Sequence, residues 1–304
     1  MISLICPIYN EEESIESFLI HIKKLIDCHN LQLELLFIDD GSSDHSLKVL
    51  INAKKENDNI RIIRFSRNFG KEAALTAGLN FAKGAAVIPI DVDLQDPPQV
   101  IVQLIEKWNA GYQIVLAKRS DRKKDSFLKR ITANFFYSIH NKLADHKIPA
   151  NVGDFRLMDR RVVEEINKLP ERQRFMKGLF SWVGFNSTTI TYSRAERNNG
   201  TSKFSFWKLW NFAIEGITSF STIPLKIWSY IGAIVAVISF IYGIFIIFLT
   251  LFSGVEVPGY SSLMVVILFL GGIQLIGIGV LGEYIGRIYL ETKARPLFII
   301  DKEY

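Results

Sequence analysis

Cysteine is scarce in this sequence, and the common phosphate-binding loops are missing. Two cysteines, Cys6 and Cys28, among 304 residues are too few for a disulfide framework or a zinc cage. No Gly-x-Gly-x-x-Gly follows the first apolar run and no Gly-Lys-Ser or Gly-Lys-Thr occurs, which weighs against dinucleotide-binding enzymes and ATPases. The net charge of +5 comes with no nucleic-acid motif. We therefore expect anionic lipid and phosphates as partners, and no nucleic acid.

Charged residues are absent from two long stretches near the C-terminus, residues 227–252 and 263–282. Each is long enough to cross a hydrocarbon core, which needs about 20 apolar residues, and residues 253–262 would link them as a hairpin. A buried helix of a globular domain is the alternative for either stretch, but two adjacent runs favour membrane insertion. Lysine and arginine flank the pair and are absent from the link, which predicts cytoplasmic termini. The flanking residues are Lys203, Lys208, Lys226, Arg287, Lys293, Arg295 and Lys302.

The expected domain order follows from these spans. A cytoplasmic catalytic domain over residues 1–202 precedes an aromatic and basic segment over 203–226, which is typical of a helix lying in the membrane interface. Two spans at about 227–252 and 262–284 lead into a cytoplasmic tail over 287–304, and Glu283 should pair with Arg287 one helical turn later. A small-residue face on the second span predicts a homo-oligomer, with a tetramer as one arrangement; its glycines are Gly271, Gly272, Gly277, Gly279 and Gly282.

Apolar runs short enough for strands alternate with helix-length stretches in the first 120 residues. Continuous runs of this kind are typical of buried parallel strands, and the alternation predicts a doubly wound, Rossmann-like α/β sheet. In such sheets ligands bind beyond the carboxyl ends of the strands. We expect strands at residues 2–8, 33–38, 60–65, 85–90 and 112–117, and helices at 12–28, 43–56, 70–83 and 97–109.

Polar residues follow the first four expected strands, where they would share one rim of the sheet. Asp39 could accept hydrogen bonds from a nucleobase or ribose, and Tyr9 could stack on a base, so the rim is suited to a nucleotide. Each group alone could instead be a turn or a helix cap; Ser43 or Asp44, for instance, could cap the next helix.

The run Asp91-Val-Asp-Leu-Gln-Asp-Pro-Pro follows the fourth expected strand. Asp91 and Asp93 can converge with the Gln95 carbonyl on one hard divalent cation, because Mg²⁺ and Mn²⁺ prefer oxygen ligands. Such a cation would neutralise a diphosphate while a sugar leaves. The alternative is an acidic loop that caps the following helix, and we assign that capping role to Asp96.

Five motifs resemble the family 2 glycosyltransferases of the GT-A fold, and within them the polyprenyl-phosphate sugar transferases. The likeness is greatest to bactoprenol glucosyltransferases, with a relation to dolichol-phosphate mannose synthase. The motifs are CPIYNEE (6–12), DDGSSD (39–44), DVDLQDPP (91–98), GDFRLMD (153–159) and RNNGTSKF (197–204). Val92 stands where a small residue such as Ala would be expected. The absence of a Gln-x-x-Arg-Trp motif and the presence of two spans disfavour the processive polysaccharide synthases.

The resemblance also implies roles for individual residues. The metal and the donor diphosphate would be handled by Asp91, Asp93 and Gln95. The nucleoside would be held by Pro7, Tyr9, Glu11, Asp39 and Asp40.

The acceptor that the resemblance implies is a lipid phosphate, which is anionic near neutral pH and needs little help from a general base. The enzyme must instead hold two phosphates that repel each other, which is a task for basic side chains. Asp154 should hydrogen-bond a sugar hydroxyl or accept a proton, with an ion pair to Arg156 as the alternative, and Asp159 should cap the helix over 162–168. The side chains expected at the lipid phosphate are Arg119, Arg130, Arg197 and Lys203.

The sequence thus predicts a multi-pass enzyme of the bacterial inner membrane that transfers one hexose from a nucleotide sugar to polyprenyl phosphate, such as undecaprenyl phosphate. Metal-assisted displacement with inversion is the expected mechanism, and the resemblance to the bactoprenol branch implies UDP-glucose as the favoured donor. A donor of the GDP-mannose or UDP-aminoarabinose type stays open, because motif residues do not define the sugar pocket. Two rival hypotheses are a catalytically silent membrane scaffold and glycosylation of a lipid alcohol, which would require a general base.

Overall fold

The computed structural model describes residues 1–120, 152–172, 174–193, 223–253 and 259–304. The chain divides into two compact units, residues 1–216 with 295–304 and residues 217–294. Most of the predicted interface segment over 203–226 lies outside the described residues, and so do Arg130, Arg197 and Lys203.

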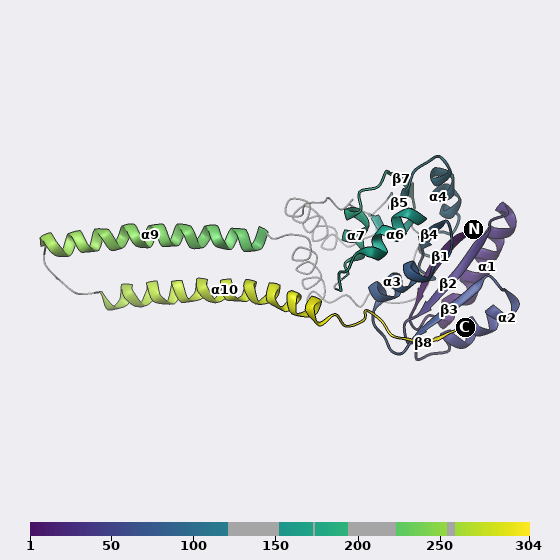
Figure 1. The fold of residues 1–304 in the computed structure, drawn as a ribbon, viewed down its shortest axis with the longest axis horizontal. Coiled ribbons are helices and arrows are strands. Elements are labelled where there is room, and N and C mark those ends of the chain that lie inside the picture. Colours follow the sequence, from purple (N-terminus) through teal and green to yellow (C-terminus); the bar gives the residue numbers. More distant parts are fainter. Residues whose placement is uncertain (121–151, 173, 194–222, 254–258) are drawn as a thin grey trace. The chain divides into compact units, whose positions relative to one another are not determined.

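Within the described part of the first unit, eight strands form one sheet in the order β7-β5-β6-β4-β1-β2-β3-β8 (Figure 1). The first three strands and β4 pair in parallel, whereas β6 is antiparallel to both β4 and β5, and β8 is antiparallel to β3. The strands are β1 (Ile2–Ile8), β2 (Leu33–Asp39), β3 (Ile60–Phe65), β4 (Ala86–Pro89), β5 (Ile114–Arg119), β6 (Val152–Asp159), β7 (Ser187–Tyr192) and β8 (Ile300–Glu303).

The α/β class and the five predicted strands are confirmed, each strand to within two residues. The sheet is mixed rather than purely parallel, because β6 lies between β4 and β5. The strands β6, β7 and β8 were not predicted. The β6 sequence mixes Asp and Arg with apolar residues, and β8 is exposed along its whole length, so neither gives the continuous apolar run of a buried parallel strand.

Helices cover both faces of the sheet (Figure 1). One face packs on α1 (Glu12–His29), α2 (Ser46–Glu56) and α4 (Val100–Asn109), and the other on α3 (Lys71–Phe81), α6 (Arg160–Lys168) and α7 (Met176–Trp182). The apolar residues of α1 recur at helical spacing, so they form one stripe that enters the core; they are Ile15, Phe18, Ile22 and Leu25.

Helix α3 lies unusually close to β1. A Cβ atom on Gly78 would stand 2.1 Å from Ile5 Cγ2, which is inside van der Waals contact, so glycine is required at this approach. The close packing fixes the helix against the sheet and places its first residue, Lys71, at the carboxyl ends of the strands.

Two helix-cap predictions have different outcomes. Asp159 is the N-cap of α6, accepting a hydrogen bond from the Arg161 backbone N–H at 3.0 Å, as predicted. The prediction for Asp96 is wrong, because α4 begins at Val100 with Gln99 as its N-cap. The Asp96 carboxylate is buried and accepts a hydrogen bond from the Tyr192 hydroxyl. This contact connects the loop after β4 to β7.

The second unit contains α9 (Ile223–Ser253) and α10 (Tyr260–Lys293). Residues Leu225–Phe245 and Val265–Lys293 of these helices are long and apolar enough to cross a membrane. Their large side chains, such as Phe240 at 71% and Leu275 at 71%, are exposed, which is the opposite of a helix buried in a globular core.

Two contacts within the second unit bear on the sequence predictions. The ion pair between Glu283 and Arg287 is present at 3.0 Å. A Cβ atom on Gly277 would stand 1.8 Å from Trp228 Nε1. Gly277 therefore serves packing between α9 and α10 of one chain, and the oligomer prediction stays a prediction for the other glycines.

Candidate active site

A cavity of about 310 Å³, here called the outer cavity, opens at the carboxyl ends of β1, β2 and β4. The loops after these strands, the loop between β3 and α3, and the first turn of α3 form its walls. Its side chains therefore come from parts of the sequence that are far apart. Its lining residues are Pro7, Ile8, Tyr9, Glu11, Asp40, Asn68, Gly70, Lys71, Ala74, Asp91, Val92 and Asp93.

A smaller cavity of about 90 Å³, here called the inner cavity, adjoins the outer one. The ends of β5 and β6 and the first turn of α7 contribute to it. Three cations, Lys71, Arg119 and Lys177, line it together with carboxylates. Its remaining lining residues are Leu75, Pro89, Ile90, Asp91, Asp96, Gly153, Asp154 and Phe155.

The two cavities share Lys71 and Asp91. The Lys71 ammonium lies 2.7 Å from Asp91 Oδ1 and 3.2 Å from Asp154 Oδ2. Asp154 therefore pairs with Lys71, a contact that sequence reasoning did not propose. Arg156 donates a hydrogen bond to the Gly153 carbonyl at 2.6 Å, and its guanidinium lies over the Phe180 ring.

The charges of this cluster keep one another ionised. Burial lowers the pKa of Lys71, but the two carboxylates outweigh this effect and raise it above its usual value. Burial likewise raises the pKa of Asp154, but the charges of Lys71, Lys177 and Arg156 hold it below its usual range. An ionised Asp154 is a hydrogen-bond acceptor only, so it is suited to receiving a hydroxyl.

The predicted nucleoside residues fall into two layers. Pro7, Tyr9, Glu11 and Asp40 line the outer cavity, and Tyr9 is 49% exposed, which leaves its ring free to stack. Asp39 and Gln95, although described by the structure, line neither cavity.

Backbone contacts hold the two carboxylates at the carboxyl end of β2. Asp40 accepts hydrogen bonds from the N–H groups of Phe69 at 2.6 Å and Gly70 at 2.9 Å. Asp39 is fully buried and accepts a hydrogen bond from the Ser42 N–H at 3.0 Å. Asp39 thus shapes the β2 loop from behind, whereas Asp40 joins it to the chain before α3.

The residues expected to hold a divalent cation lie on the loop after β4. Asp91 and Asp93 both face the outer cavity, and Leu94 bends the loop between Asp93 and Gln95 with a left-handed φ of 55°. Gln95 is buried, and its N–H donates to Asp93 Oδ1 at 3.1 Å. Two carboxylates on one cavity wall fit a hard cation such as Mg²⁺ or Mn²⁺.

Sequence reasoning missed Lys71, Lys177 and Glu72. Glu72 follows Lys71 on α3 and accepts a hydrogen bond from the Met176 N–H at 3.3 Å. Burial and the charge of Asp154 raise the pKa of Glu72 to about 7. The available signal was the position of Gly70-Lys71-Glu72 at the start of an expected helix after the third strand, a rim position like those of the aspartates.

Comparisons with known proteins agree with this architecture. Residues 3–167 match the model of glycosyl transferase family 2, and residues 223–288 match the GtrB C-terminal hairpin. The chain belongs to glycosyltransferase family 2, and with its apolar hairpin it is a membrane-associated glycosyltransferase.

The relatives include bactoprenol glucosyl transferases. The SfII prophage-derived bactoprenol glucosyl transferase of Shigella flexneri is 58% identical over 304 residues, covering 100% of this chain and 98% of the relative. The prophage bactoprenol glucosyl transferase homolog of Escherichia coli K12 is 57% identical over 302 residues, covering 99% and 98%. Among solved structures, glucosyl-3-phosphoglycerate synthase from Mycobacterium tuberculosis, in complex with Mn²⁺ and UDP-glucose, has a TM-score of 0.45 at 20% identity, covering 72% of this chain and 77% of the other.

Proposed function

We propose that this protein transfers one glucose from UDP-glucose to polyprenyl phosphate, such as undecaprenyl phosphate, with inversion at the anomeric carbon. The observation that carries the proposal is the arrangement of two adjoining cavities that share Lys71 and Asp91. The glucose and the lipid acceptor are taken from the bactoprenol glucosyl transferases, which match this chain along its whole length.

The outer cavity would hold the donor. Tyr9 offers a ring for the base, and Pro7, Glu11 and Asp40 complete the wall on that side, while Asp39 supports the wall from behind. The diphosphate would lie towards Asp91 and Asp93, where its charge requires cations. A divalent ion held by Asp91, Asp93 and the Gln95 carbonyl would neutralise the diphosphate as UDP leaves. The Gln95 N–H also supports Asp93.

The inner cavity would hold the acceptor phosphate and the sugar. Arg119 and Lys177 offer positive charge to the phosphate, and Asp154 can accept a hydrogen bond from a sugar hydroxyl. A lipid phosphate oxygen attacks the anomeric carbon, the bond from that carbon to the β-phosphate oxygen breaks, and UDP leaves with the bonding electrons. Lys71 lies between the two cavities and would stabilise charge on both sides. Arg130, Arg197 and Lys203 stay predicted contacts of the lipid phosphate.

The membrane hairpin would bring the lipid to this site. Because β8 pairs with β3, the C-terminal segment and the N-terminal domain belong to one compact unit. This supports a topology in which both ends of the hairpin would lie on the same side of the membrane. Lysine and arginine at these ends and none in the link between the spans favour the cytoplasmic side. We therefore propose a two-span protein of the inner membrane with its active site in the cytoplasm.

The test is transfer of radiolabelled sugar from separate UDP- and GDP-sugars to undecaprenyl phosphate by detergent-purified protein, with Mn²⁺ or Mg²⁺ and an EDTA control. Label should enter the lipid phase from UDP-glucose and be lost with EDTA and with Asp93→Ala. Transfer from another donor alone would replace glucose in the proposal. Transfer to a dephosphorylated lipid would favour the alcohol acceptor, and nucleotide binding without any transfer would favour the scaffold.

A further inference from the structure

The chain returns from α10 to the catalytic sheet and adds β8 to its edge (Figure 1). Tyr304 and Ile62 exchange two backbone hydrogen bonds, at 2.9 and 3.3 Å, and the Ser66 N–H donates to the Ile299 carbonyl at 3.0 Å. The last of these contacts reaches beyond β3, into the loop over residues 66–70 that connects β3 to α3. We call this stretch the β3–α3 loop and residues 298–304 the C-terminal brace.

Aromatic rings continue the contact between the brace and the loop. Phe298 stacks on Phe65 with ring centroids 5.0 Å apart and an interplanar angle of 8°. Phe65 in turn meets Phe69 edge-on at 5.8 Å, and the Arg67 guanidinium lies 4.0 Å over the Phe69 ring. Aromatic pairs of this kind contribute specific geometry as well as buried area. The row of rings thus connects the C-terminus of the chain to the β3–α3 loop.

The β3–α3 loop is a wall of the outer cavity. Asn68 and Gly70 line that cavity directly, and Lys71 follows as the first residue of α3. The N–H groups of Phe69 and Gly70 hold the Asp40 carboxylate. A Cβ atom on Gly41 would stand 2.5 Å from the Arg67 carbonyl carbon, so the loops after β2 and β3 pack without a gap.

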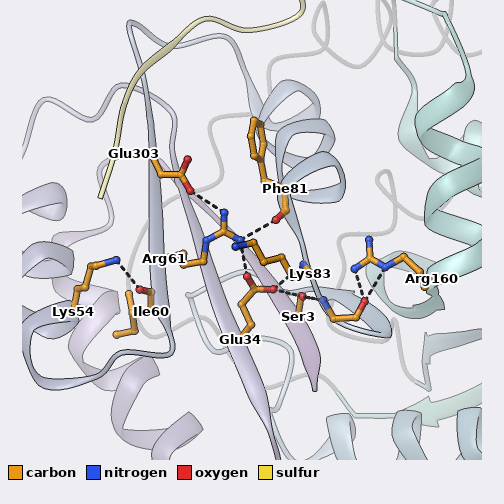
Figure 2. Close-up of polar contacts among 10 residues, drawn as sticks. Ser3, Glu34, Lys54, Ile60, Arg61, Phe81, Lys83, Arg160 and Glu303 are labelled. Atoms are coloured by element: carbon orange, nitrogen blue, oxygen red, sulfur yellow. Dashed lines mark hydrogen bonds and ion pairs between the residues drawn. The ribbon is translucent and has the colours of Figure 1, made fainter.

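The other end of the brace is fixed near the amino end of β3, where Glu303 pairs with Arg61. Figure 2 shows Arg61 between Glu303 and Glu34, with N–O distances of 2.8 and 2.7 Å, while it also donates to the Phe81 carbonyl. Glu34 lies near the amino end of β2, whereas Asp39 is its last residue and Asp40 follows it. A change at Glu303 therefore perturbs the brace without touching the row of rings.

We propose that the C-terminal brace positions the donor-binding wall, with Phe298 as its main positioning residue. The inference rests on the proposed function only in that the outer cavity takes a nucleoside diphosphate. Without the Phe298 ring, Phe65 loses its stacking partner and the β3–α3 loop loses its support, so Asn68 and Gly70 are no longer held in register for the diphosphate. Lys71, on α3, keeps its contacts with Asp91 and Asp154. Donor binding should weaken, while the acceptor side, built on β5, β6 and α7, is unaffected.

The test compares full-length Phe298→Ala, Phe298→Leu and Phe298→Tyr with the control Glu303→Gln, all purified in detergent. Calorimetric binding of UDP, the KM values for UDP-glucose and undecaprenyl phosphate, kcat and the melting temperature are measured. Phe298→Ala should raise the UDP Kd and the donor KM about tenfold, with the acceptor KM and kcat within twofold of wild type. Phe298→Tyr keeps the ring. This variant and Glu303→Gln should keep the UDP Kd, both KM values and kcat within twofold of wild type. If Phe298→Ala does not fold, Phe298→Leu, which keeps apolar bulk without the ring, provides the measurement with the same direction of change.

The inference is overturned if Phe298→Ala and Phe298→Leu bind UDP like wild type, or if Glu303→Gln weakens donor binding as much as they do. An equal rise in both KM values would also overturn it, because a general loss of structure affects both substrates. Wild-type protein that binds UDP but transfers no glucose would refute the proposed function alone, and the inference is then decided by UDP binding. Wild-type protein that does not bind UDP would overturn both.

Discussion

Replacing Lys71 with methionine should separate catalysis from stability at this site. Methionine keeps the length of the side chain and removes the charge that the two cavities share. The ammonium contacts Asp91 at 2.7 Å and Asp154 at 3.2 Å. Lys71→Met leaves both carboxylates without this partner, so the change acts on stability, on cation binding and on the reaction.

The expected cost in stability is small. A hydrogen bond to a charged group contributes about 1.5–3 kcal/mol, but the side chains of Lys71 and Asp91 are 44% and 36% exposed, and exposed ion pairs contribute about 1 kcal/mol or less. Asp154 is 23% exposed and retains more of its contact energy. We expect a loss of about 1–3 kcal/mol in total, which lowers the melting temperature by a few degrees in a domain of this size.

The expected cost in rate is larger. Removing one fixed donor that faces developing charge lowers kcat by about 100- to 1,000-fold in enzymes where this has been measured. The assay is glucose transfer at saturating UDP-glucose and undecaprenyl phosphate, beside a thermal melt and a Mn²⁺ titration. Mn²⁺ should bind more tightly to Lys71→Met, because Asp91 no longer shares its charge with an ammonium.

Lys177→Met is the matched control. Lys177 also acts on Asp154 but lines only the inner cavity, so its loss should raise the KM for the lipid phosphate and leave Mn²⁺ binding unchanged. A kcat for Lys71→Met within threefold of wild type would refute the assignment of Lys71 to the reaction. Equal effects of the two variants on Mn²⁺ binding would contradict the proposal that Asp91, the partner of Lys71, is a metal ligand.

Three further predictions test other parts of the site. Asp93→Asn should raise the Mn²⁺ concentration needed for half-maximal transfer by about 100-fold, since even changes around a metal ligand cost 10- to 100-fold; an unchanged titration would exclude Asp93 as a ligand. Arg119→Ala should raise the KM for undecaprenyl phosphate by about 10-fold or more, the size of one charge-assisted contact, and a rise confined to the donor KM would contradict its placement in the inner cavity. Burial and the charge of Asp154 raise the pKa of Glu72 from 4.5 to about 7, so the folded state favours the neutral carboxyl group. The resulting contribution to the free energy of unfolding is about 3 kcal/mol; it is complete below pH 4.5 and is lost as the pH rises through 7. Glu72→Gln should therefore flatten the melting temperature between pH 5 and pH 8, and a pH dependence equal to that of wild type would disprove the effect.

The sequence predicted the parts of the fold whose residues are buried on both sides. Strands such as β2, buried along its entire length, give continuous apolar runs that have few other interpretations. The strand β8 gave no such signal, because its residues are all exposed and its pairing with β3 joins positions more than 200 residues apart. Long-range pairing of an exposed edge strand depends on backbone hydrogen bonds, which every residue offers, so side-chain patterns cannot identify it.

The candidate site was predicted from its acidic residues and missed in its basic ones. Asp91 and Asp93 were found because aspartates at a strand end have few structural roles beyond turns and caps. Lys71 was not, since a lysine at the start of a helix is ordinary in a sequence, and its role depends on the close approach of α3 to β1 at Gly78. The same limit explains Asp96, which had the sequence of a helix cap but serves as the acceptor for Tyr192 from another strand.

The position of Lys71 also bears on how the proposed site would handle two phosphates. A donor diphosphate and a lipid phosphate repel each other, and a site with cations on its outer edges alone would not relieve the repulsion between them. Lys71 belongs to the wall that both cavities share, so in the proposed complex a single ammonium would face the gap between the two anions. Asp91 and Asp154 supply negative charge that raises the pKa of this lysine and keeps it protonated. When substrates and a divalent cation bind, phosphate oxygens would replace Asp91 and Asp154 as the partners of the Lys71 ammonium, and the lysine would stay protonated. The positive charge that the reaction requires would therefore be in place before either substrate binds.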